Sequence, residues 1–494
     1  VESARTLSVM GGLVNDGVIT VNLQSGSGTG MFYVDTGALS GSGEVFLNSG
    51  GNLDTATLNA ATGQTITHGV DHTIRGAGNI YAIVINHGLI TADQSGRTLQ
   101  LLTGAKSSSS LISATNGGTL ALTNFTLTQA NEAVVLNDAS TLSLSGVTIV
   151  DGTVRTLGAG LTQLVGSSTF NGVTNEGAMQ VNSARTLTIL NGVANDGVIT
   201  VNPEGSGSGT TINFGNSGAF AGEGEVNLSA STNVDTAVIS ASPKATVTNV
   251  ASHLIRGTGS ITAPLINLGE IRADRDERTL RLSAGAKTNN SLMTAVNGST
   301  LLLSNFTLTQ APAGLIFANG GDVNFIGATV NGGIVDSAPG SVGRLTGSAT
   351  FSAVENRGGL LVNSATTLTV ANGITNSGAI TINPQASGSG TNIQFANDGN
   401  LAGDGELILA AGTNVDTAVL NSVSAAVVTH DAAHLIRGTG SITAPIVNNG
   451  EIRADRTGAV LRLSAGAKTN NDLMTAVNGS TLLISSTTVT QAPG

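Results

Sequence analysis

The sequence predicts an all-β fold, a right-handed parallel β-helix (β-solenoid) of about 22 to 25 coils. Three observations predict it. Long blocks of the chain recur at a fixed offset, apolar and polar residues alternate along short runs, and glycine or asparagine separates one run from the next. Alternation with period two places apolar side chains on one face of a strand, and glycine and asparagine supply left-handed turns between strands.

A stretch of nearly identical sequence gives the period of the repeat. LIRGTGSITAPLINLGEIRAD begins at Leu254 and returns as LIRGTGSITAPIVNNGEIRAD from Leu435, and 435 minus 254 gives an offset of 181. A more diverged copy begins at Thr73, and 254 minus 73 again gives 181. Because composition does not change between the copies, we expect one continuous domain. The starts VESARTL, VNSARTL and VNSATTL divide it into three super-repeats, the last of them shorter: 1–180, 181–361 and 362–494.

The runs between the turns have the pattern of half-buried strands. Apolar and charged residues alternate from Glu270 to Asp274, and no run keeps helical spacing. Aromatic residues make up only 3% of the chain and Trp is absent, so the core must consist of small aliphatic side chains. At the roughly 4.8 Å spacing of stacked strands, the coils would form a rod on the order of 110 Å long.

Charge and cysteine content exclude several classes of protein. Charged residues make up 10% of the chain, and the net charge of -11 is spread over its length. No basic cluster is present to neutralise phosphates, so we expect no nucleic acid partner. Without Cys, neither disulfides nor thiolate metal sites can hold the chain, and we expect no cofactor. No apolar run approaches the roughly 20 residues that a membrane-spanning helix needs.

A finer repeat, Asn-x-Gly followed by an aliphatic residue, predicts how the coils stack. Its glycines advance from Gly177 in steps of 20, 21, 51 and 89, which sum to 181. A step of about 20 residues fits one coil of three short strands. We expect these asparagines and glycines to form ladders, although turn chemistry alone would give the same recurrence. The predicted ladder residues are Asn175, Asn195, Asn216, Asn356, Asn376, Asn397, Gly177, Gly197 and Gly218.

The ladder also predicts a difference in stability between two asparagines. Asn195 lies between two predicted ladder residues, whereas Asn202 lies beside a Gly-Ser-rich turn. We therefore expect Asn195→Ala to destabilise the protein more than Asn202→Ala.

The most charged stretch runs from Arg272 to Arg281, and on the surface of a β-helix it could bind an acidic sugar. We favour a solvated turn with mutually paired charges, because the first super-repeat has uncharged residues around Asp93 at the corresponding place. Pectin-degrading β-helix enzymes are similar in shape and use adjacent Asp pairs, a Gly-His-Gly and an Arg-x-Lys. None of these strings occurs here.

Four positions, occupied by His, Arg, Asp and Lys, recur at the repeat offset in all three super-repeats, and we favour a structural role for each. We expect the histidines and arginines to pack around a turn, because histidines a whole super-repeat apart cannot share one metal ion. We expect the aspartates to be satisfied turn residues rather than calcium ligands, and the lysines to be exposed in turns. The residues are His72, His253 and His434; Arg75, Arg256 and Arg437; Asp54, Asp235 and Asp416; and Lys106, Lys287 and Lys468.

The Asn-x-Gly-x-Ile coils, the Gly-x-Gly turns in GSGEV, GEGEV and RGTGSI, and the absence of Cys give the chain a resemblance to a known family. It resembles the right-handed β-helix stalks of large bacterial exoproteins, the filamentous-haemagglutinin-like and autotransporter-passenger adhesins. The resemblance implies export across a Gram-negative envelope with an outer-membrane partner, followed by display outside the cell. Lack of Cys suits such export, since disulfides formed early would hinder threading.

The sequence therefore favours a structural protein without enzymatic activity. We expect the rod of a surface adhesin or filament that mediates display, adhesion or contact between cells or with a matrix, because duplication of whole blocks adds length without a new site. The alternative is a carbohydrate-binding or carbohydrate-degrading β-helix protein, such as a polysaccharide lyase, a hydrolase or a phage tailspike.

The expected partners follow from the same reading. Val1 begins in phase with Val181 and Val362, inside an ordinary coil, so we expect the native chain to continue into further copies of the block. Uncapped coils expose strand edges that recruit other chains, so we expect association end to end or laterally into fibres. A glycan or protein receptor on a host or neighbouring cell is the other expected partner.

Overall fold

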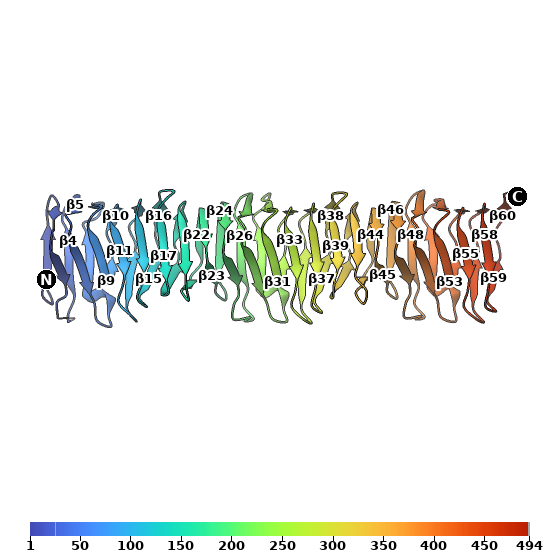
Figure 1. Cartoon of the computed structure of the whole chain (residues 1–494), viewed down its shortest axis with the longest axis horizontal. Coiled ribbons are helices and arrows are strands. Elements are labelled where there is room, and N and C mark those ends of the chain that lie inside the picture. The colour runs from blue at the N-terminus through green and yellow to red at the C-terminus, as the bar shows by residue number, and fades with distance from the viewer. Residues whose placement is uncertain (25, 493–494) are drawn as a thin grey trace. The chain divides into compact units, whose positions relative to one another are not determined.

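The computed structural model describes residues 1–24 and 26–492, which form strands and almost no helix (Figure 1). Turns join strands β1 to β60, and the helices of the described residues are the short 3-10 segments Leu53–Thr55, Val234–Thr236 and Val415–Thr417. The chain comprises two compact units, Val1–Ile255 (unit 1) and Arg256–Gly494 (unit 2). Each unit is a stack of parallel coils, and the units together hold about 22 turns. The predicted all-β class and parallel β-solenoid are confirmed.

Two successive coils of unit 1 show the arrangement. Each strand pairs in parallel with the strand three places later, so that Leu99 lies beside Leu120 and Ile112 lies beside Val135. Each inner coil is therefore hydrogen-bonded to the coil before it and the coil after it. The strands of the two coils are β12 (Thr98–Leu102), β13 (Lys106–Ser108) and β14 (Leu111–Ala114), then β15 (Thr119–Thr123), β16 (Thr126–Gln129) and β17 (Val134–Asp138).

Other strands carry the inward-facing polar residues and the surface groove. In unit 1 these strands are β8 (Thr65–His68), β10 (Ile83–Asn86), β22 (Ser168–Glu176), β24 (Thr186–Asn195), β25 (Val198–Val201), β27 (Gly218–Ala221), β28 (Glu225–Ser229) and β30 (Val247–Asn249). In unit 2 they are β44 (Ala349–Asn356), β46 (Thr367–Asn376), β49 (Gly399–Ala402), β50 (Glu406–Ala410), β52 (Val428–His430), β53 (Leu435–Ile442), β54 (Ile446–Asn448), β57 (Lys468–Asn470) and β60 (Val489–Gln491).

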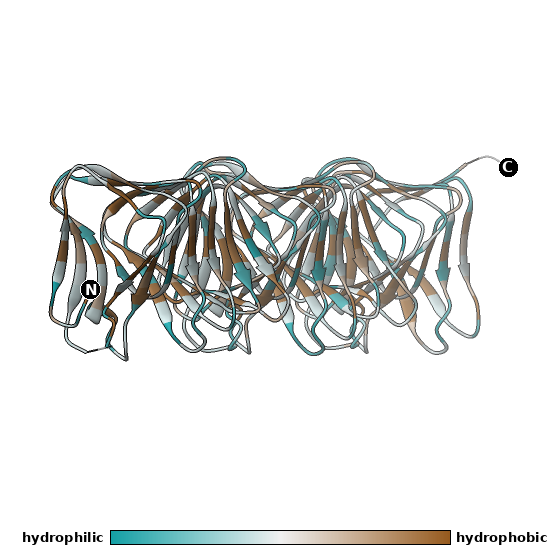
Figure 2. Cartoon of the chain, turned by 60° about the vertical axis from the view of Figure 1, so that its left-hand side comes forward, coloured by the Kyte–Doolittle hydropathy of each residue, from teal (hydrophilic) through white to brown (hydrophobic). Residues whose placement is uncertain are grey.

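The core consists of aliphatic side chains stacked from coil to coil. Leu99 and Leu101 of β12 are fully buried, and so are Leu120 and Leu122, which stack on them from β15. Burying each leucine contributes about 1.5 to 3 kcal/mol relative to leaving it exposed. Figure 2 shows the resulting alternation of hydrophobic and hydrophilic residues along the strands.

The coils differ in length because their turns differ. Thr162 pairs with Met179 and Gly37 pairs with Ile66, so the step along the chain is much shorter in the first coil than in the second. The strands keep their pairing in both cases, and the extra residues lie in the turns. A fixed step of about 20 residues therefore does not locate the stacked residue in every coil.

Candidate functional site

A row of buried amide and imidazole side chains passes through the coils of unit 2, and we call it the core polar row. Its members lie at or next to strand ends, and each is hydrogen-bonded to the next over 2.6 to 3.1 Å. All but the last are no more than 5% exposed. In order, the residues are Asn356, Asn376, His434, His430, Asn448, Asn470 and Gln491.

The hydrogen bonds of this row all point in one direction. The Nδ2 group of Asn376 donates to the carbonyl of Glu406, so it also presents a proton to Nε2 of His434. His434 then donates from Nδ1 to Nε2 of His430, and His430 donates from Nδ1 to Asn448. Both rings are therefore neutral and carry their proton on Nδ1. Burial, followed by the neighbouring His430, lowers the pKa of His434 to about 3.

Gly403 leaves space for the hydrogen bond between the imidazole of His434 and Asn376. His434 reaches Asn376 over a separation of 58 residues, past an intervening coil. That coil places Gly403 against Asn376, where an added Cβ would meet the Asn376 carbonyl oxygen at 2.3 Å. With a φ of 101° as well, this position requires glycine.

Unit 1 contains related buried hydrogen bonds. In super-repeat 2, Asn175 donates to Asn195 at 2.8 Å, and Asn195 in turn contacts Nε2 of His253 at 3.1 Å. His253 donates from Nδ1 to Asn249, and burial lowers the pKa of His253 to about 4. In super-repeat 1 the order of the row is Asn15, His72, His68, Asn86 and Ser108.

The structure brings some of the predicted ladder residues together and separates others. Asn175 stacks on Asn195, as Asn356 stacks on Asn376, and Gly197 stacks on Gly177. The next coil of unit 1 is longer, because Val198 pairs back to Ala178 but forward to the more distant Glu225. The residues that follow Gly197 and Gly378 in their stacks are therefore Gly224 and Gly405, from the Gly-x-Gly turns.

Asn216, Asn397 and Gly218 lie elsewhere, on the surface. Asn216 exchanges hydrogen bonds with Asn191, and Asn191 also donates to Asn171, which gives an exposed surface row. Asn397 exchanges the same bonds with Asn372 in unit 2, and Gly218 packs against Gly192. One sequence motif thus serves two positions at different depths.

Asn202 is also buried, which removes it as a control for Asn195. Its side chain is 0% exposed, its φ is 60°, and its amide bonds to Ser206 through both the carbonyl and the hydroxyl of that serine. We expected Asn202 to lie beside a Gly-Ser-rich turn, and the structure shows that residues of this turn cover its side chain.

The lysines are not exposed turn residues, and that prediction is wrong. Lys287 is 2% exposed, and its Nζ donates to the carbonyls of Ala263, Ser283, Ala284 and Gly285. The turn has a left-handed residue, Ala284, and aims its carbonyls inward, where the ammonium satisfies them.

The other two lysines are held in the same way. Lys106 donates to three carbonyls and Lys468 to three, and both are no more than 4% exposed. Burial lowers the pKa of Lys106 and of Lys287 to about 7 and that of Lys468 to about 8. In the neighbouring coils the residues in register with Lys287 are Leu265 and Leu308. The lysine therefore occupies a core position that apolar residues fill in the adjacent coils.

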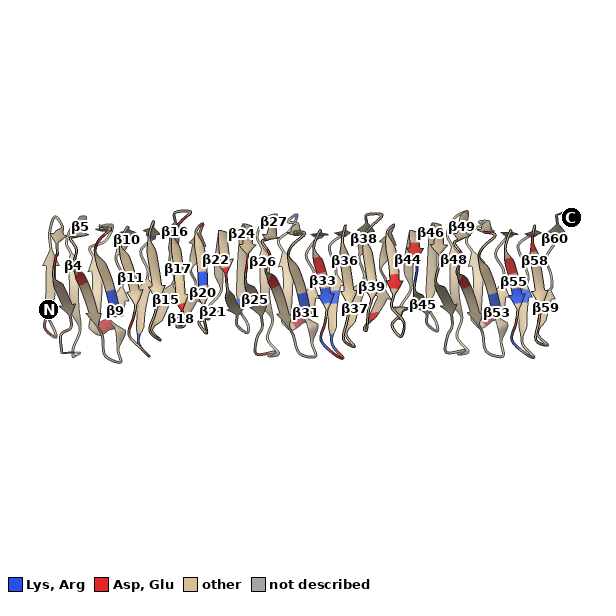
Figure 3. Cartoon of the chain, viewed as in Figure 1, with Lys and Arg blue, Asp and Glu red and all other residues tan. Residues whose placement is uncertain are grey.

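The recurring arginines form ion pairs with acidic residues, and Figure 3 shows where charged residues lie along the strands. Arg75 bonds to Glu44 at 2.7 Å and to Asp93 at 3.2 Å. Arg437 makes the corresponding pairs with Glu406 and Asp455 in unit 2.

The charged stretch of super-repeat 2 is also paired internally. Arg272 binds Glu270 through two bonds of 2.7 Å, and Arg275 lies 3.9 Å from Asp274. These contacts agree with the predicted turn of mutually paired charges, and they do not favour the alternative, a site for an acidic sugar.

The recurring aspartates belong to the three 3-10 helices. Asn52 caps the first of them by accepting a hydrogen bond from the backbone N–H of Asp54, and Asn233 and Asn414 do the same in the others. Asp54 also accepts from Asn79 and from the hydroxyl of Tyr81. Within residues 1–24 and 26–492, no three His, Asp or Glu side chains lie together in a way that could hold a metal ion.

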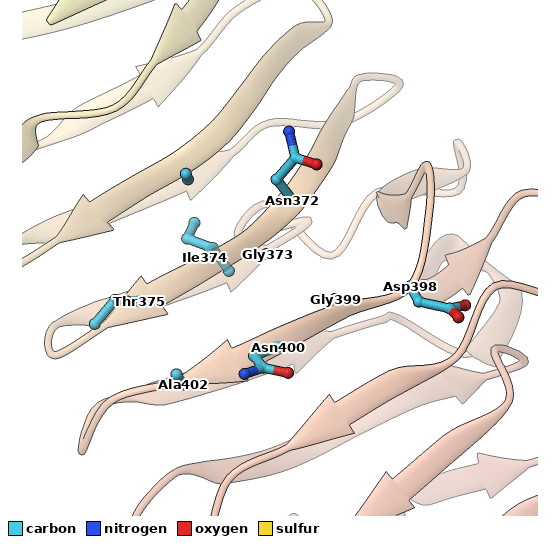
Figure 4. A pocket seen from close by; sticks show the side chains of 9 residues that line it. Asn372, Gly373, Ile374, Thr375, Asp398, Gly399, Asn400 and Ala402 are labelled. Carbon is cyan, nitrogen blue, oxygen red and sulfur yellow. The ribbon is translucent and has the colours of Figure 1, made fainter.

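An open groove lies on the surface of unit 2 between β46 and β49 (Figure 4). Its volume is about 380 Å³. Glycines form its floor, the exposed Thr375 lies on β46 in register with Ala402, and the exposed Asp398 and Asn400 lie at the start of β49, farther along the groove. Its lining residues are Ala353, Asn372, Gly373, Ile374, Thr375, Asp398, Gly399, Asn400 and Ala402.

Comparison of the chain with family models, curated proteins and solved structures gives no match. In the part of the chain that the structure describes, each helix is a single short turn, so none has the length to cross a membrane.

Proposed function

We propose that this chain is a structural region of a bacterial surface protein, an adhesin stalk or filament-forming segment that is exported from a Gram-negative-type cell. The observation that carries the proposal is the stacking of parallel coils, built from blocks that recur at a fixed offset, around an aliphatic core and buried polar rows. Such a chain gains length by adding blocks, because each coil needs contacts only with its neighbours.

The proposal includes partners of two kinds. Copies of the chain associate with one another into fibres, since coils built from one repeated block present matching strand edges. A glycan or protein on a host or neighbouring cell serves as receptor, and an outer-membrane protein serves in export. The absence of Cys and the spread of the -11 net charge support an exported protein without a nucleic acid partner.

Surface labelling of the cells that produce the protein tests the proposal. An antibody raised against residues 181–361 should stain intact cells, and external protease should remove the staining. In-frame deletion of one such block should keep display, because the strands that meet at the new junction belong to the same phase of the block. Staining that requires cell lysis would contradict the proposal.

A carbohydrate-degrading β-helix enzyme is the second candidate, and the open polar groove of unit 2 is the observation that favours it. Glycoside hydrolysis needs two carboxyl groups on either side of the scissile bond, whereas the lining of this groove has one, Asp398. Release of reducing ends from a polysaccharide panel by the purified chain would favour the enzyme over the structural protein.

A further inference from the structure

The groove between β46 and β49 has a counterpart on the same backbone in super-repeat 2. We call the first the Asn400 groove (Asn372 to Thr375 and Asp398 to Asn400) and the second the Ala219 surface (Asn191 to Ala194 and Ser217 to Ala219). Each residue of the second precedes its equivalent by the repeat offset of 181. The strand pairing is the same, since Ile374 lies beside Leu401 as Val193 lies beside Phe220.

The glycines of both surfaces are required by the backbone. A Cβ on Gly373 would lie 3.0 Å from the backbone nitrogen of Asn400, and one on Gly192 would lie 2.9 Å from that of Ala219. Their φ angles of 78° and 82° also favour glycine. The concave floor is thus a property of the fold, and what differs between the copies is the set of side chains around it.

One of the differing positions has a structural role in each super-repeat. Oδ1 of Asp398 accepts from the backbone N–H of Val427 at 2.8 Å, and the hydroxyl of Ser217 accepts from Thr246 at 3.1 Å. The fold therefore needs one oxygen here, which a serine provides. Asp398 adds a second oxygen, Oδ2, which has no hydrogen-bond partner among the described residues and lies at an exposed position.

Two other polar residues of the groove have no structural role that the counterpart retains. Thr375 and Asn400 are exposed and make no side-chain hydrogen bond within the described part of the chain. Their equivalents are Ala194 and Ala219, so the same backbone forms with a methyl group at each place. Asn372, by contrast, bonds to Asn397 just as Asn191 bonds to Asn216, and it belongs to the fold.

We propose that the Asn400 groove is a binding site for a neutral saccharide, with Thr375, Asp398 and Asn400 as its polar contacts. The amide and the hydroxyl each donate and accept hydrogen bonds, and the free carboxylate oxygen accepts them, which is the combination that sugar hydroxyls need. The lining has no Lys or Arg to hold an anionic sugar. One carboxylate is also too few for a divalent cation, which takes six or more oxygen ligands.

The composition of the groove also predicts how strongly it binds. It contains no aromatic ring to stack on a sugar face, and it is open to solvent. We therefore expect a dissociation constant in the range of about 1 mM, as for a weak site whose avidity depends on repetition. This inference deepens the proposed function by naming the class of receptor.

Saturation-transfer NMR on the purified chain tests the inference with maltose, lactose and cellobiose as neutral probes and a galacturonic acid dimer as the anionic one. The decisive variant combines Thr375→Ala, Asp398→Ser and Asn400→Ala, which gives these three positions the residues that super-repeat 2 carries on the same backbone. It should fold normally and bind at least about tenfold more weakly. Ser377→Ala, at an exposed position outside the lining, is the matched control and should bind as the original chain does.

A gain of function makes the test reciprocal. Ala194→Thr, Ser217→Asp and Ala219→Asn together should raise the stoichiometry from one bound sugar to two. Binding of no neutral sugar, binding of the anionic probe alone, or unchanged binding by the triple loss variant would each overturn the inference. None of these results depends on where the protein resides, so surface labelling can succeed when the saccharide site fails.

Discussion

The buried polar rows of super-repeats 2 and 3 differ at one position, and a second difference compensates for it. His430 in super-repeat 3 corresponds to Asn249 in super-repeat 2. In the neighbouring coil, Leu401 pairs in register with His430, and Phe220 pairs with Asn249. Super-repeat 2 thus has one ring fewer in the row and one ring more in the adjacent coil. That ring, Phe220, stacks on His253 with ring centroids 5.2 Å apart.

This comparison teaches which properties the rows preserve. Asn249 accepts a hydrogen bond from Nδ1 of His253, as Nε2 of His430 accepts one from Nδ1 of His434, so it keeps the acceptor role of His430. Its Nδ2 group donates to the backbone carbonyl of His253. The two exchanges also oppose each other in size, because the smaller side chain in the row of super-repeat 2 has the larger one beside it in the adjacent coil, which suits dense packing. Super-repeat 1 has the same pair as super-repeat 3, with Leu39 beside His68.

Acid should have the largest effect on these rows. Burial lowers the pKa of His68 and of His253 to about 4, below the roughly 6.5 of an unfolded chain. Between these values the unfolded state binds more protons, so stability is full above about pH 6.5 and falls as the pH drops toward 4. Each ring should contribute a loss on the order of 3 kcal/mol, although Glu225 and Asp196 near His253 oppose part of the shift.

Urea denaturation followed by circular dichroism at several pH values between about 7.5 and 4 measures this loss. His87→Ala is the control, because His87 is exposed and bonds only to Ser109 among the described residues. The control should lose stability in parallel with the original chain. A midpoint that stays constant over the whole range would contradict neutral buried rings.

Exchanging the compensating pair should have the next largest effect. His430→Asn leaves a cavity and Leu401→Phe overfills the coil, so each alone should destabilise unit 2 by about 1 to 3 kcal/mol. The double variant reproduces the pair found in super-repeat 2 and should return to within about 0.5 kcal/mol of the original chain. Denaturation midpoints of the four proteins complete the cycle, and costs that simply add would show that the two positions are independent.

Asn195→Ala should have a smaller effect. It removes one hydrogen bond each from the Nδ2 group of Asn175, from Nε2 of His253 and from the carbonyl of Glu225, and Asn175 keeps its second bond, to Gly177. An unsatisfied buried group costs about 1 to 3 kcal/mol, so we expect a loss near 2 kcal/mol. Hydrogen exchange of the amides in β24 and β25 should accelerate locally, and unchanged exchange there would count against the row as a source of stability.

Asn216→Ala should have the smallest effect, although Asn216 occurs in the same Asn-x-Gly motif. Its bonds to Asn191 lie on the surface, where water replaces them, so the expected loss is within about 0.5 kcal/mol. The measurement is the urea midpoint beside that of Asn195→Ala. Equal shifts for the two variants would remove the distinction between the core and surface rows.

The sequence allowed the all-β class, the parallel stacking and the pairing of Asn175 with Asn195 to be predicted, because period-two alternation and a constant block length report directly on strands and stacking. It misplaced Asn216 because turn length is independent of strand pairing, so an equal step along the chain is not an equal step along the stack. The GEGEV turn, shortly after Gly218, was the available signal for Gly224.

The burial of Lys287 could not be read from local sequence. Four carbonyls hold its ammonium, and one of them belongs to Ala263 in the preceding coil. The position of the lysine in a GAK turn led us to expect an exposed turn residue. The Asn400 groove was missed for a different reason, since its polar residues are recognised only when the same backbone is seen with alanines in super-repeat 2.

The one-way order of the core polar row gives unit 2 an electrical polarity that no net charge reveals. From Asn356 to Gln491 each amide or ring donates to the next member of the row, so their dipoles share one sense along it, as peptide dipoles do in a helix. If one amide were flipped, its NH2 group would meet the donor of one neighbour and its oxygen would meet the acceptor of the other. The hydrogen bonds of the row can therefore reverse only all together. An inserted segment must therefore arrive with the same sense, a condition that tandem duplication of complete blocks satisfies automatically.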